Sequence, residues 1–206
     1  MEERGPIVFV VDDDLSVREA LRSLIRSAGM RCDTFATAAD FLRHPRPDAP
    51  ACLVLDVQLP GGSGLDLPTE LKESGVDLPI IFITGHGTIP MSVRAMKAGA
   101  LEFLTKPFSE HELLGAIDQA LARDREMRAR RAEVEALRER FAKLTARERD
   151  VFELVVTGRM NKEIAAELGT AEQTVKQHRG RVMQKLGARS VADLVHLAER
   201  LVPAPP

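Results

Sequence analysis

The sequence predicts an α/β domain, doubly wound around a five-stranded parallel sheet, which a helical linker joins to an all-α helix-turn-helix domain. Three observations predict this architecture. Short apolar runs alternate with segments of helical periodicity in the first part of the chain. Several of those runs are apolar throughout, which is typical of strands buried on both faces of a parallel sheet. Residues 145–202 contain only helical patterns. The expected boundaries are 1–121 for the first domain, 122–143 for the linker and 144–206 for the second domain.

Strands and helices are expected to alternate five times in the first domain. Ile7–Val11 is a β-branched run that ends in three aspartates, and Ser16–Ala28 has helical periodicity and stops at Gly29. The further strands are expected at Arg31–Phe35, Ala51–Leu55, Pro79–Ile83 and Leu101–Leu104, and the further helices at Ala38–Leu42, Leu65–Glu73, Met91–Ala98 and from Ser109 onward. Ligands of such sheets bind outside the carboxyl ends of the strands, so the residues just after each apolar run are the candidate site.

The last of these helices is expected to continue into the linker. After Leu121 it becomes rich in charged residues, and no proline interrupts it before Leu144. A short heptad-like stripe follows, made of Val134, Leu137, Phe141 and Leu144. A solvated linker helix is the first interpretation of this stripe, and the seam of a parallel dimer is the alternative.

The second domain is expected to hold four helices and a tail. The helices are expected at Thr145–Val156, Asn161–Leu168, Glu172–Leu186 and Ser190–Leu201. Thr145 and Glu148 have the spacing of a capping box at the start of the first one. Residues 203–206 are rich in proline and are expected to be a disordered tail.

Charge and composition limit the classes of function. Residues 1–120 carry 11 Lys and Arg against 18 Asp and Glu, whereas residues 121–206 carry 18 against 13. A basic second half favours contact with nucleic acid, although an ordinary fluctuation of surface charge is the alternative. No apolar run is long enough to cross a bilayer, so no membrane partner is expected. The acidic N-terminus lacks the layout of a secretory signal, and the two cysteines are too few for a disulfide framework, so a cytoplasmic location is expected.

Five polar residues follow successive predicted strands: Asp12, Asp13, Asp56, Thr84 and Lys106. Because the carboxyl ends of parallel strands meet at one edge of the sheet, these side chains are expected to converge. Three carboxylates repel one another unless a cation lies among them, and oxygen ligands without His or Cys indicate Mg²⁺. A carboxylate beside Mg²⁺, a hydroxyl and an ammonium can accept a phosphoryl group. Any one of these residues alone would be an ordinary solvent-facing loop residue.

The residues around these positions resemble the receiver domains of response regulators, most closely those of the FixJ type. The resemblance is carried by Val11–Asp14, Leu55–Gly64, Ile83–Gly87, Ala95–Ala100 and Leu104–Phe108. It implies a flavodoxin-like fold with Asp56 as the phosphoacceptor. It also implies that Asp13, Asp56 and the backbone carbonyl of Gln58 bind Mg²⁺, with Asp12 acting through water.

The same resemblance implies the conformational switch and the partners of the first domain. Thr84 and Phe103 would be the switch pair, and a cis peptide would join Lys106 to Pro107. A sensor histidine kinase would dock on the first helix, around Ser16, Val17 and Leu21. On phosphorylation the chain would form a homodimer through the surface of the fourth helix and the fifth strand, Met91–Leu104.

The segment Glu172–Leu186 has the composition of a DNA-recognition helix. It carries five basic residues or histidines on one short helix, at Lys176, His178, Arg179, Arg181 and Lys185, and one acid. Val175, Val182, Met183 and Leu186 supply its expected buried face. A basic helix of this kind fits the major groove, whereas a solvated basic helix is the alternative interpretation.

Residues 142–202 resemble the LuxR-type output domain. The resemblance is carried by Leu144–Glu148, Asn161–Ala165, Thr174–Lys176 with His178, and Lys185–Leu186. It implies that Lys176, Gln177 and Gly180 lie where the family contacts bases, and that Asn161, Lys162, Thr174 and His178 lie where it contacts the DNA backbone. Because Gly180 lacks a side chain, Arg179 or Arg181 is expected to take over its contact. Gln177 stands where Val is common, and Ala171 replaces a common Ser cap.

The sequence therefore predicts a response regulator that binds double-stranded promoter DNA, with RNA polymerase as a further partner, and not an enzyme. An aspartyl-nucleophile phosphatase is the enzymatic alternative, but such enzymes need a second acid two residues after the nucleophile, where this chain has Gln58. A regulator with an unphosphorylated, purely dimerising first domain is the other alternative, and the complete set of strand-end residues disfavours it.

Overall fold

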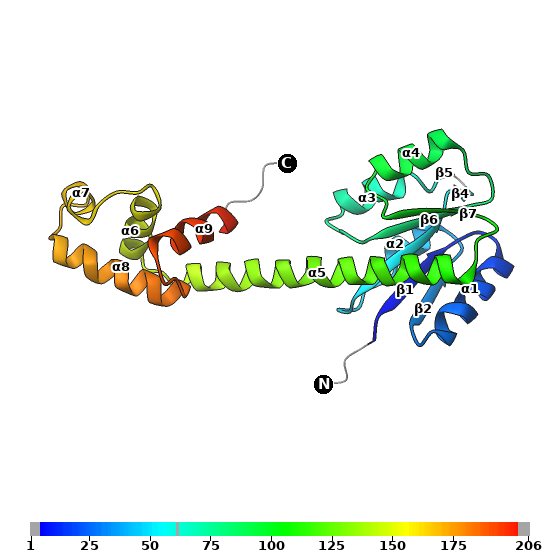
Figure 1. The fold of residues 1–206 in the computed structure, drawn as a ribbon, viewed down its shortest axis with the longest axis horizontal. Helices are drawn as coiled ribbons and strands as arrows, with labels where there is room; N and C mark the ends of the chain where they lie inside the picture. Colours follow the sequence, from blue (N-terminus) through cyan, green and yellow to red (C-terminus); the bar gives the residue numbers. More distant parts are fainter. Residues whose placement is uncertain (1–4, 61, 202–206) are drawn as a thin grey trace. The chain divides into compact units, whose positions relative to one another are not determined.

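A computed structural model describes residues 5–60 and 62–201 and divides the chain into two compact units, residues 1–128 and 129–206. The first unit is a five-stranded parallel sheet in the order β2-β1-β3-β6-β7 (Figure 1). Its strands are β1 (Ile7–Val11), β2 (Arg31–Phe35), β3 (Ala51–Asp56), β6 (Ile80–Thr84) and β7 (Glu102–Thr105). This confirms the predicted doubly wound α/β fold.

Helices cover both faces of this sheet. Its helices are α1 (Leu15–Ser27), α2 (Ala38–Arg43), α3 (Leu67–Glu73), α4 (Ile89–Lys97) and the first part of α5 (Glu110–Ala142). The side chains of β1 alternate between two cores, because successive residues of a strand point to opposite faces. Phe9 packs with residues of α2, α3 and α4, whereas Val8 and Val10 pack with residues of α1 and α5. Burial on both faces explains why the central strands β1, β3 and β6 are nearly continuous apolar runs.

A short hairpin after β3 was not expected from the sequence. Its strands β4 (Gln58–Leu59) and β5 (Gly62–Ser63) pair in antiparallel register, within the stretch expected to be a loop. Most helix boundaries lie within one residue of prediction, but two helices begin two residues away from the expected start. Helix α3 begins at Leu67 rather than Leu65, and α4 begins at Ile89 rather than Met91, where the Thr88 hydroxyl caps the helix by accepting from the backbone of Met91.

Helices are the only regular secondary structure in the described residues of the second unit. It contains the end of α5, then α6 (Ala146–Val156), α7 (Asn161–Glu167), α8 (Glu172–Leu186) and α9 (Val191–Leu201). Thr145 and Glu148 form the predicted capping box at the start of α6. Helix α8 ends at Gly187, whose left-handed conformation, with φ of 74°, suits glycine. The predicted disordered tail, 203–206, lies outside the described residues.

The end of α5 belongs to the core of the second unit. Leu137 and Leu144 are buried there among residues of α6, α7, α8 and α9, and Phe141 packs edge-to-face against Phe152. The expectation of a solvated stripe is therefore wrong for these residues, because the apolar stripe is covered by the chain's own helices. Val134 lies beside a surface hollow lined by other α5 residues and stays half-buried. Within the described residues, no helix combines the length and apolarity that crossing a membrane requires.

Candidate phosphorylation and DNA-binding sites

The strand ends of the first unit bring one lysine and two aspartates into direct contact. The Lys106 ammonium lies 2.7 Å from Asp12 Oδ2 and 2.6 Å from Asp56 Oδ2. Asp12 directly follows β1, Asp56 is the last residue of β3, and Lys106 directly follows β7. The in-register parallel pairing of the strands places their carboxyl ends at one edge of the sheet. Three of the five predicted strand-end residues are thus joined in one hydrogen-bonded cluster.

The cluster has more negative than positive charge and is largely shielded from water. The side chain of Asp12 is fully buried and that of Asp56 is nearly so. Burial raises the pKa of Asp12, and this outweighs its hydrogen bonds to Lys106 and to the backbone of Asp14. Burial would lower the pKa of Lys106, but its hydrogen bonds to both carboxylates raise it. One lysine therefore balances two aspartates incompletely, and the site favours a further cation.

The other predicted residues of this site occupy different positions. Thr84, at the end of β6, is buried, and its Oγ1 accepts a hydrogen bond of 3.2 Å from the backbone of His86. The backbone N–H of Gln58 donates to Asp56 Oδ1 at 2.8 Å. Asp13 is exposed to solvent. The side chain of Asp13 therefore lies in solvent, although Asp13 is next in sequence to the buried Asp12.

The donor set is compatible with Mg²⁺ but does not form a closed metal cage. Among the residues that the structure describes, no three His, Cys, Asp or Glu side chains are gathered as a metal-binding group. Mg²⁺ commonly keeps several waters and takes only one or two protein carboxylates. Asp13, Asp56 and the Gln58 carbonyl offer hard oxygen ligands of that kind, and the fit rests on this chemistry of the donors.

Two glycines next to this cluster were not identified from the sequence. A Cβ at Gly64 would collide with the backbone oxygen of Asp56, and the Gly64 N–H donates to the carbonyl of Val57 at 2.8 Å. A Cβ at Gly87 would collide with the Thr105 side chain and would lie 3.3 Å from the Phe103 ring. Only glycine permits these close approaches. In the sequence, Gly64 comes eight residues after Asp56 and Gly87 three residues after Thr84, within the motifs that carry the receiver resemblance.

The predicted switch pair lies on neighbouring strands. Thr84 ends β6 and Phe103 lies in β7, where it is half-buried. The peptide bond between Lys106 and Pro107 is cis, as expected. A change in the position of Thr84 would therefore act on the adjacent strand, β7, which carries Phe103.

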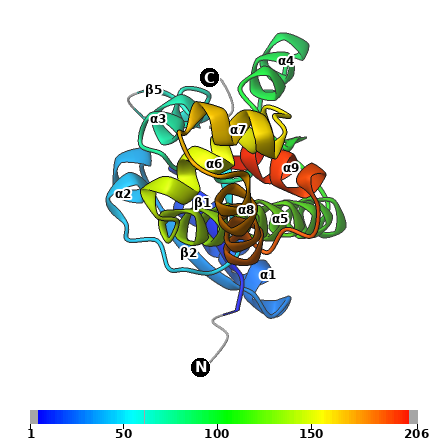
Figure 2. The same ribbon diagram turned by 90° about the vertical axis from the view of Figure 1, so that its left-hand side faces the viewer.

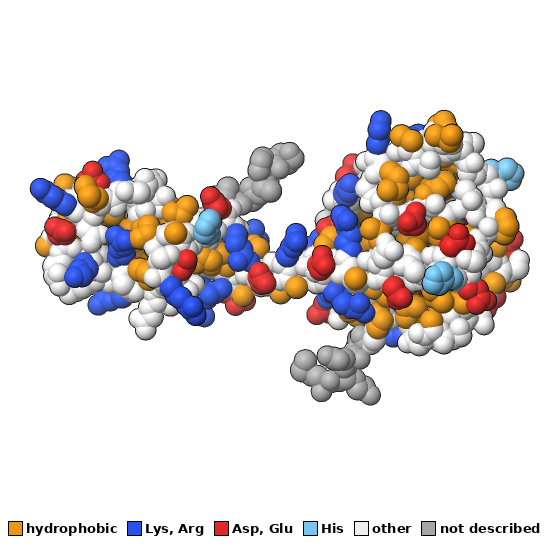
Figure 3. Space-filling model, in the orientation of Figure 1, with side chains coloured by type: hydrophobic (Ala, Val, Ile, Leu, Met, Phe, Trp, Pro, Cys, Tyr) orange, Lys and Arg blue, Asp and Glu red, His pale blue; other side chains and the backbone are white. Residues whose placement is uncertain are grey.

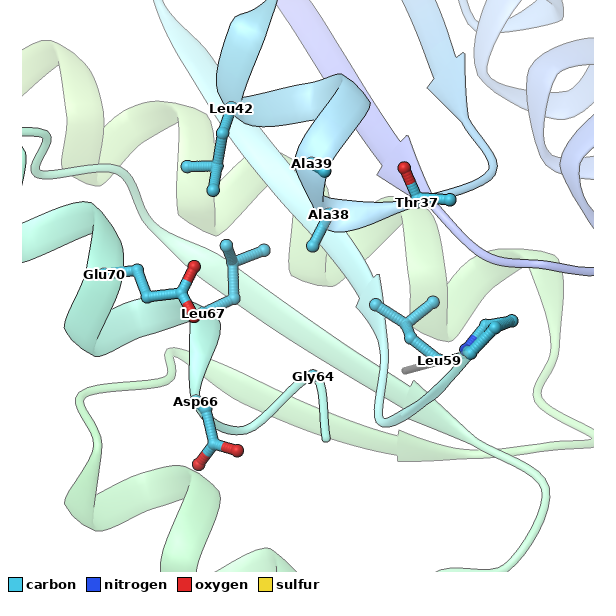
Figure 4. A pocket seen from close by; sticks show the side chains of 10 residues that line it. Thr37, Ala38, Ala39, Leu42, Leu59, Gly64, Asp66, Leu67 and Glu70 are labelled. Atoms are coloured by element: carbon cyan, nitrogen blue, oxygen red, sulfur yellow. The ribbon is translucent and has the colours of Figure 1, made fainter. Parts of the chain in front are cut away.

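A hollow of about 360 Å³ lies between α2 and α3, apart from the Lys106 cluster (Figure 4). Leu42, Leu59 and Leu67 form its apolar walls, and the acids Asp66 and Glu70 also line it. None of the predicted phosphorylation residues lines it. This hollow was not expected from the sequence.

In the second unit, α7 and α8 form the predicted helix-turn-helix, and α6 packs against both (Figure 2). Helix α8 turns one side to solvent: Gln173, Lys176, Gln177, Gly180, Arg181 and Gln184 are all exposed. They recur every three or four residues, so they share one face of the helix. Three of the eight residues predicted to contact DNA, Lys176, Gln177 and Arg181, lie on this face, and Gln173 and Gln184 extend it.

The remaining predicted DNA contacts lie beside this face or are engaged elsewhere. Arg179 is half-buried, and its Nη1 donates to Asn161 Oδ1 at 3.0 Å, which ties α8 to the start of α7. His178 is half-buried, and its Nδ1 has no hydrogen-bond partner among the described residues. Thr174 is also half-buried, whereas Lys162 is exposed. Arg181 is thus better placed than Arg179 to replace a contact at Gly180.

Ala171 provides no side-chain hydrogen bond to the start of α8, as its residue type led us to expect. The other end of α8 is held firmly. Arg140 Nη1 donates to the carbonyl of Leu186 at 3.0 Å, and Lys185 Nζ donates to the carbonyl of Lys143 at 3.1 Å. Basic side chains are frequent on the visible surface of this unit (Figure 3).

Comparison with known proteins identifies the family of each domain. A family model for the response regulator receiver domain matches residues 8–118, and a model for bacterial regulatory proteins of the luxR family matches residues 142–198. Nodulation protein W of Bradyrhizobium diazoefficiens is 54% identical over 95% of this chain and 86% of its own length. Response regulator protein TodT of Pseudomonas putida is 47% identical over 98% of this chain and 88% of its own length.

Solved structures give the same picture. The response regulator StyR is 55% identical, with a TM-score of 0.80 over 95% of this chain and 99% of that one. Full-length FixJ from B. japonicum is 37% identical, with a TM-score of 0.58 over 96% and 97% of the two chains. A parallel sheet with Asp and Lys at its strand ends, followed by a helix-turn-helix, defines a receiver domain with a DNA-binding output domain. The chain belongs to the two-component response regulators of the FixJ type, which are transcription regulators.

Proposed function

We propose that Asp56 accepts a phosphoryl group from a sensor histidine kinase and that phosphorylation makes the chain dimerise and bind promoter DNA. The observation that carries this proposal is the contact of Lys106 Nζ with both Asp12 and Asp56. An ammonium at this position neutralises charge that develops on a phosphoryl group next to Asp56. Asp56 ends its strand opposite that lysine, so it is the expected nucleophile.

In this mechanism a carboxylate oxygen of Asp56 attacks the phosphorus of a phosphohistidine. The P–N bond breaks as the acyl phosphate forms, and the imidazole leaves as a neutral group after taking up a proton. Asp13, Asp56 and the carbonyl of Gln58 would hold Mg²⁺, with Asp12 acting through water. The ion neutralises phosphoryl oxygens when it is bound. The Thr84 hydroxyl would donate a hydrogen bond to a phosphoryl oxygen.

The dimer interface would lie on α4 and β7. Ile89 is 82% exposed, and Val93 and Met96 are also exposed, which is unusual for large apolar side chains on one short helix. Hydrophobic side chains are visible together over α4 (Figure 3). Movement of Thr84 toward the phosphoryl group, with Phe103 turning inward, would change the surface next to this patch.

The kinase would dock on α1, but with a different set of residues from that expected. Leu21 is buried in the core, so it is not available for docking. Leu15, by contrast, is 62% exposed, and Ser16 next to it is exposed as well. The proposed docking surface therefore includes Leu15 and no longer includes Leu21.

The exposed face of α8 would enter the major groove. Lys176, Gln177 and Arg181 would contact base edges there. Lys162 would contact phosphate, as would residues at the rim of the face such as Thr174 and His178. Because dimeric helix-turn-helix proteins contact two half-sites, the operator would be an inverted repeat. RNA polymerase would be the further partner at the promoter.

Phosphoryl trapping tests the central step. The protein is incubated with acetyl phosphate and Mg²⁺, and the acyl phosphate is reduced with borohydride and mapped by mass spectrometry. Label is expected on Asp56 alone, and the Asp56→Asn variant is expected to fold and to remain unlabelled. Label on Asp12 or Asp13 in the wild type would overturn the assignment.

Beryllofluoride, which mimics the phosphoryl group, tests the later steps. Light scattering should show that the wild type becomes a dimer and that Asp56→Asn does not. Selection from random DNA should then return an inverted repeat. An unchanged mass at a protein concentration of roughly tens of micromolar, well above a dissociation constant of about 1 μM, would remove dimerisation from the mechanism.

A further inference from the structure

The loop between β1 and α1 is held in place by an arginine that no phosphorylation role requires. Arg18 lies in the first turn of α1 and is half-buried. Its Nη1 donates to the carbonyl of Asp12 at 2.7 Å and to the carbonyl of Asp13 at 2.8 Å. Two hydrogen bonds from one guanidinium nitrogen thus converge on the backbone of the acidic loop.

These two carbonyls belong to the two peptide planes that flank the Cα of Asp13. Each peptide unit is rigid, so the orientation of the planes on either side of a Cα determines φ and ψ there. The direction of the Cα–Cβ bond of Asp13 follows from those angles. Arg18 therefore constrains the direction in which the Asp13 side chain leaves the backbone, without touching its carboxylate.

The rest of the loop is held by other bonds. The Asp12 N–H donates to the carbonyl of Phe35 at 3.2 Å, and the Asp14 N–H donates to Asp12 Oδ1 at 2.9 Å. Asp14 in turn caps α1 by accepting from the backbone of Ser16 at 2.8 Å. Backbone and side-chain groups are thus engaged on both sides of Asp13, whose carboxylate faces solvent.

We propose that Arg18 is a positioning residue for the divalent-cation site, and that it acts by fixing the backbone on both sides of Asp13. The inference rests on the proposed role of Asp13 as a ligand. Mg²⁺ demands near-octahedral geometry and tolerates little ligand displacement, so a loosely held Asp13 would bind it poorly. Groups that orient metal ligands commonly affect affinity as strongly as some ligands do.

The sign of the effect separates positioning from simple charge. Arg18 is a cation close to a cation site, so removing its charge would by Coulomb's law alone tighten the binding of a divalent ion. Loss of positioning does the opposite. Arg18→Met, which keeps the apolar stem and removes the donors, therefore gives opposite results under the two explanations.

Mn²⁺ binding is the measurement, followed through the spectrum of the free ion in electron paramagnetic resonance. The chain contains no Trp or Tyr, so intrinsic fluorescence offers no convenient signal. We expect Arg18→Met to weaken Mn²⁺ binding about tenfold, at the low end for ligand-orienting groups, and Arg18→Lys, which keeps the charge, to fall between it and wild type. Mg²⁺ should displace Mn²⁺ with the same order of affinities.

Arg22→Met is the matched control. Arg22 lies one turn further along α1, is also half-buried, and bonds to Glu19 and Thr34 instead of the acidic loop. Its loss should leave Mn²⁺ affinity unchanged. Thermal melting in EDTA checks that each variant is folded. If Arg18→Met is not folded, the Mn²⁺ affinity of Arg18→Lys decides, and an affinity equal to that of the wild type counts against the proposal.

Two failures are distinguishable. If the wild type binds Mn²⁺ and Arg18→Met binds it equally or more tightly, the positioning role is overturned while the cation site stands. If the wild type itself binds no divalent ion, the cation site in the proposed function fails, and the role of Arg18 with it.

Discussion

Each unit of the molecule contains a lysine paired with a buried acid, but the two arrangements differ in their balance of charge. In the second unit, Lys185 Nζ lies 2.6 Å from Glu148 Oε2, and the same carboxylate accepts from the backbone N–H of Thr145. In the first unit, Lys106 serves two buried carboxylates at once. One pair is matched, and the other has an excess of negative charge.

The two acids respond to this difference in opposite directions. Hydrogen bonds from Lys185 and the Thr145 backbone lower the pKa of Glu148, which is the behaviour of a group that stabilises the fold. Burial raises the pKa of Asp12 in spite of its lysine. An incompletely balanced site stores unfavourable negative charge that a bound cation can relieve. The distance between lysine and carboxylate alone does not distinguish a structural pair from a reactive one.

Removing each lysine should give the largest contrast. Lys106→Met leaves two buried carboxylates facing each other, so we expect the free energy of unfolding of the first unit to fall by about 2–3 kcal/mol in EDTA. Lys185→Met should cost only about 1 kcal/mol, because that lysine side chain is 36% exposed and solvent screens the pair. Calorimetry or urea unfolding of the full chain, with the two transitions assigned by these variants, measures both.

Mg²⁺ sharpens this comparison. A divalent ion should restore part of the stability lost in Lys106→Met, because it takes over the neutralisation of the carboxylates, and it should leave Lys185→Met unaffected. Equal losses for the two variants, with no response to Mg²⁺, would show that the site around Lys106 is as structural as the Glu148 pair.

A second comparison lies within α8, between Arg179, which is hydrogen-bonded to Asn161, and Arg181, which is exposed to solvent. Arg181→Ala should remove an exposed donor from the reading face and relax base preference at one operator position by about 1–3 kcal/mol. Arg179→Ala should break the bond to Asn161 and lower the melting temperature of the second unit, weakening binding to all sequences alike. Selection from random DNA with both variants tests this. An altered sequence preference for Arg179→Ala alone would reverse their roles.

The sequence was sufficient for the strand ends and insufficient for whatever holds them in place. Asp12, Asp56, Thr84 and Lys106 follow recognisable apolar runs, and parallel pairing brings such ends together regardless of detail. Arg18 carries no such mark, because its partners are backbone carbonyls, and any basic residue in a first helical turn looks like a solvated charge. The roles of Arg179 and Arg181 were equally indistinguishable in the sequence. The contact of Arg179 with Asn161 in the structure is what distinguishes them.

The apolar stripe of the linker shows a second limit. The spacing of Leu137, Phe141 and Leu144 predicts an apolar helix face correctly, but it cannot tell which surface covers that face. In the structure the chain's own α6, α7, α8 and α9 supply the cover. Asp124 is a similar case: it is buried in a charge-rich stretch and accepts from the backbone of Ala51 at 2.9 Å, a contact between residues far apart in sequence.

Lowering the pH should test the contribution of the Glu148–Lys185 pair to the stability of the second unit. The pKa of Glu148 lies below its ordinary value of 4.5, so its stabilising contribution is complete above that value and is lost as the pH falls through the lowered folded-state pKa. Glu148→Gln should therefore cost about 1–1.5 kcal/mol near neutral pH and less as the pH falls from about 6 to about 3, with Lys185 partly exposed. Thermal melting across this range measures the difference. A cost that does not change with pH would mean that the charge of Glu148 is unimportant.

Two helical glycines offer the smallest and most selective comparison between the units. Gly180 in α8 and Gly115 in α5 both have open space where a Cβ would stand. Alanine at either position should raise the free energy of unfolding of its own unit by about 0.5–1 kcal/mol, because glycine costs that much in a helix interior. The two substitutions should differ in DNA binding.

Gly180 is exposed on the reading face, so Gly180→Ala adds a methyl group toward the groove and should alter preference at one operator position, for instance by favouring the methyl group of a thymine. Gly115→Ala, in the other unit, should leave the selected sequence unchanged. If Gly180→Ala gains stability and selects the same operator as the wild type, this part of α8 does not approach the bases, and the reading face ends at Gln177.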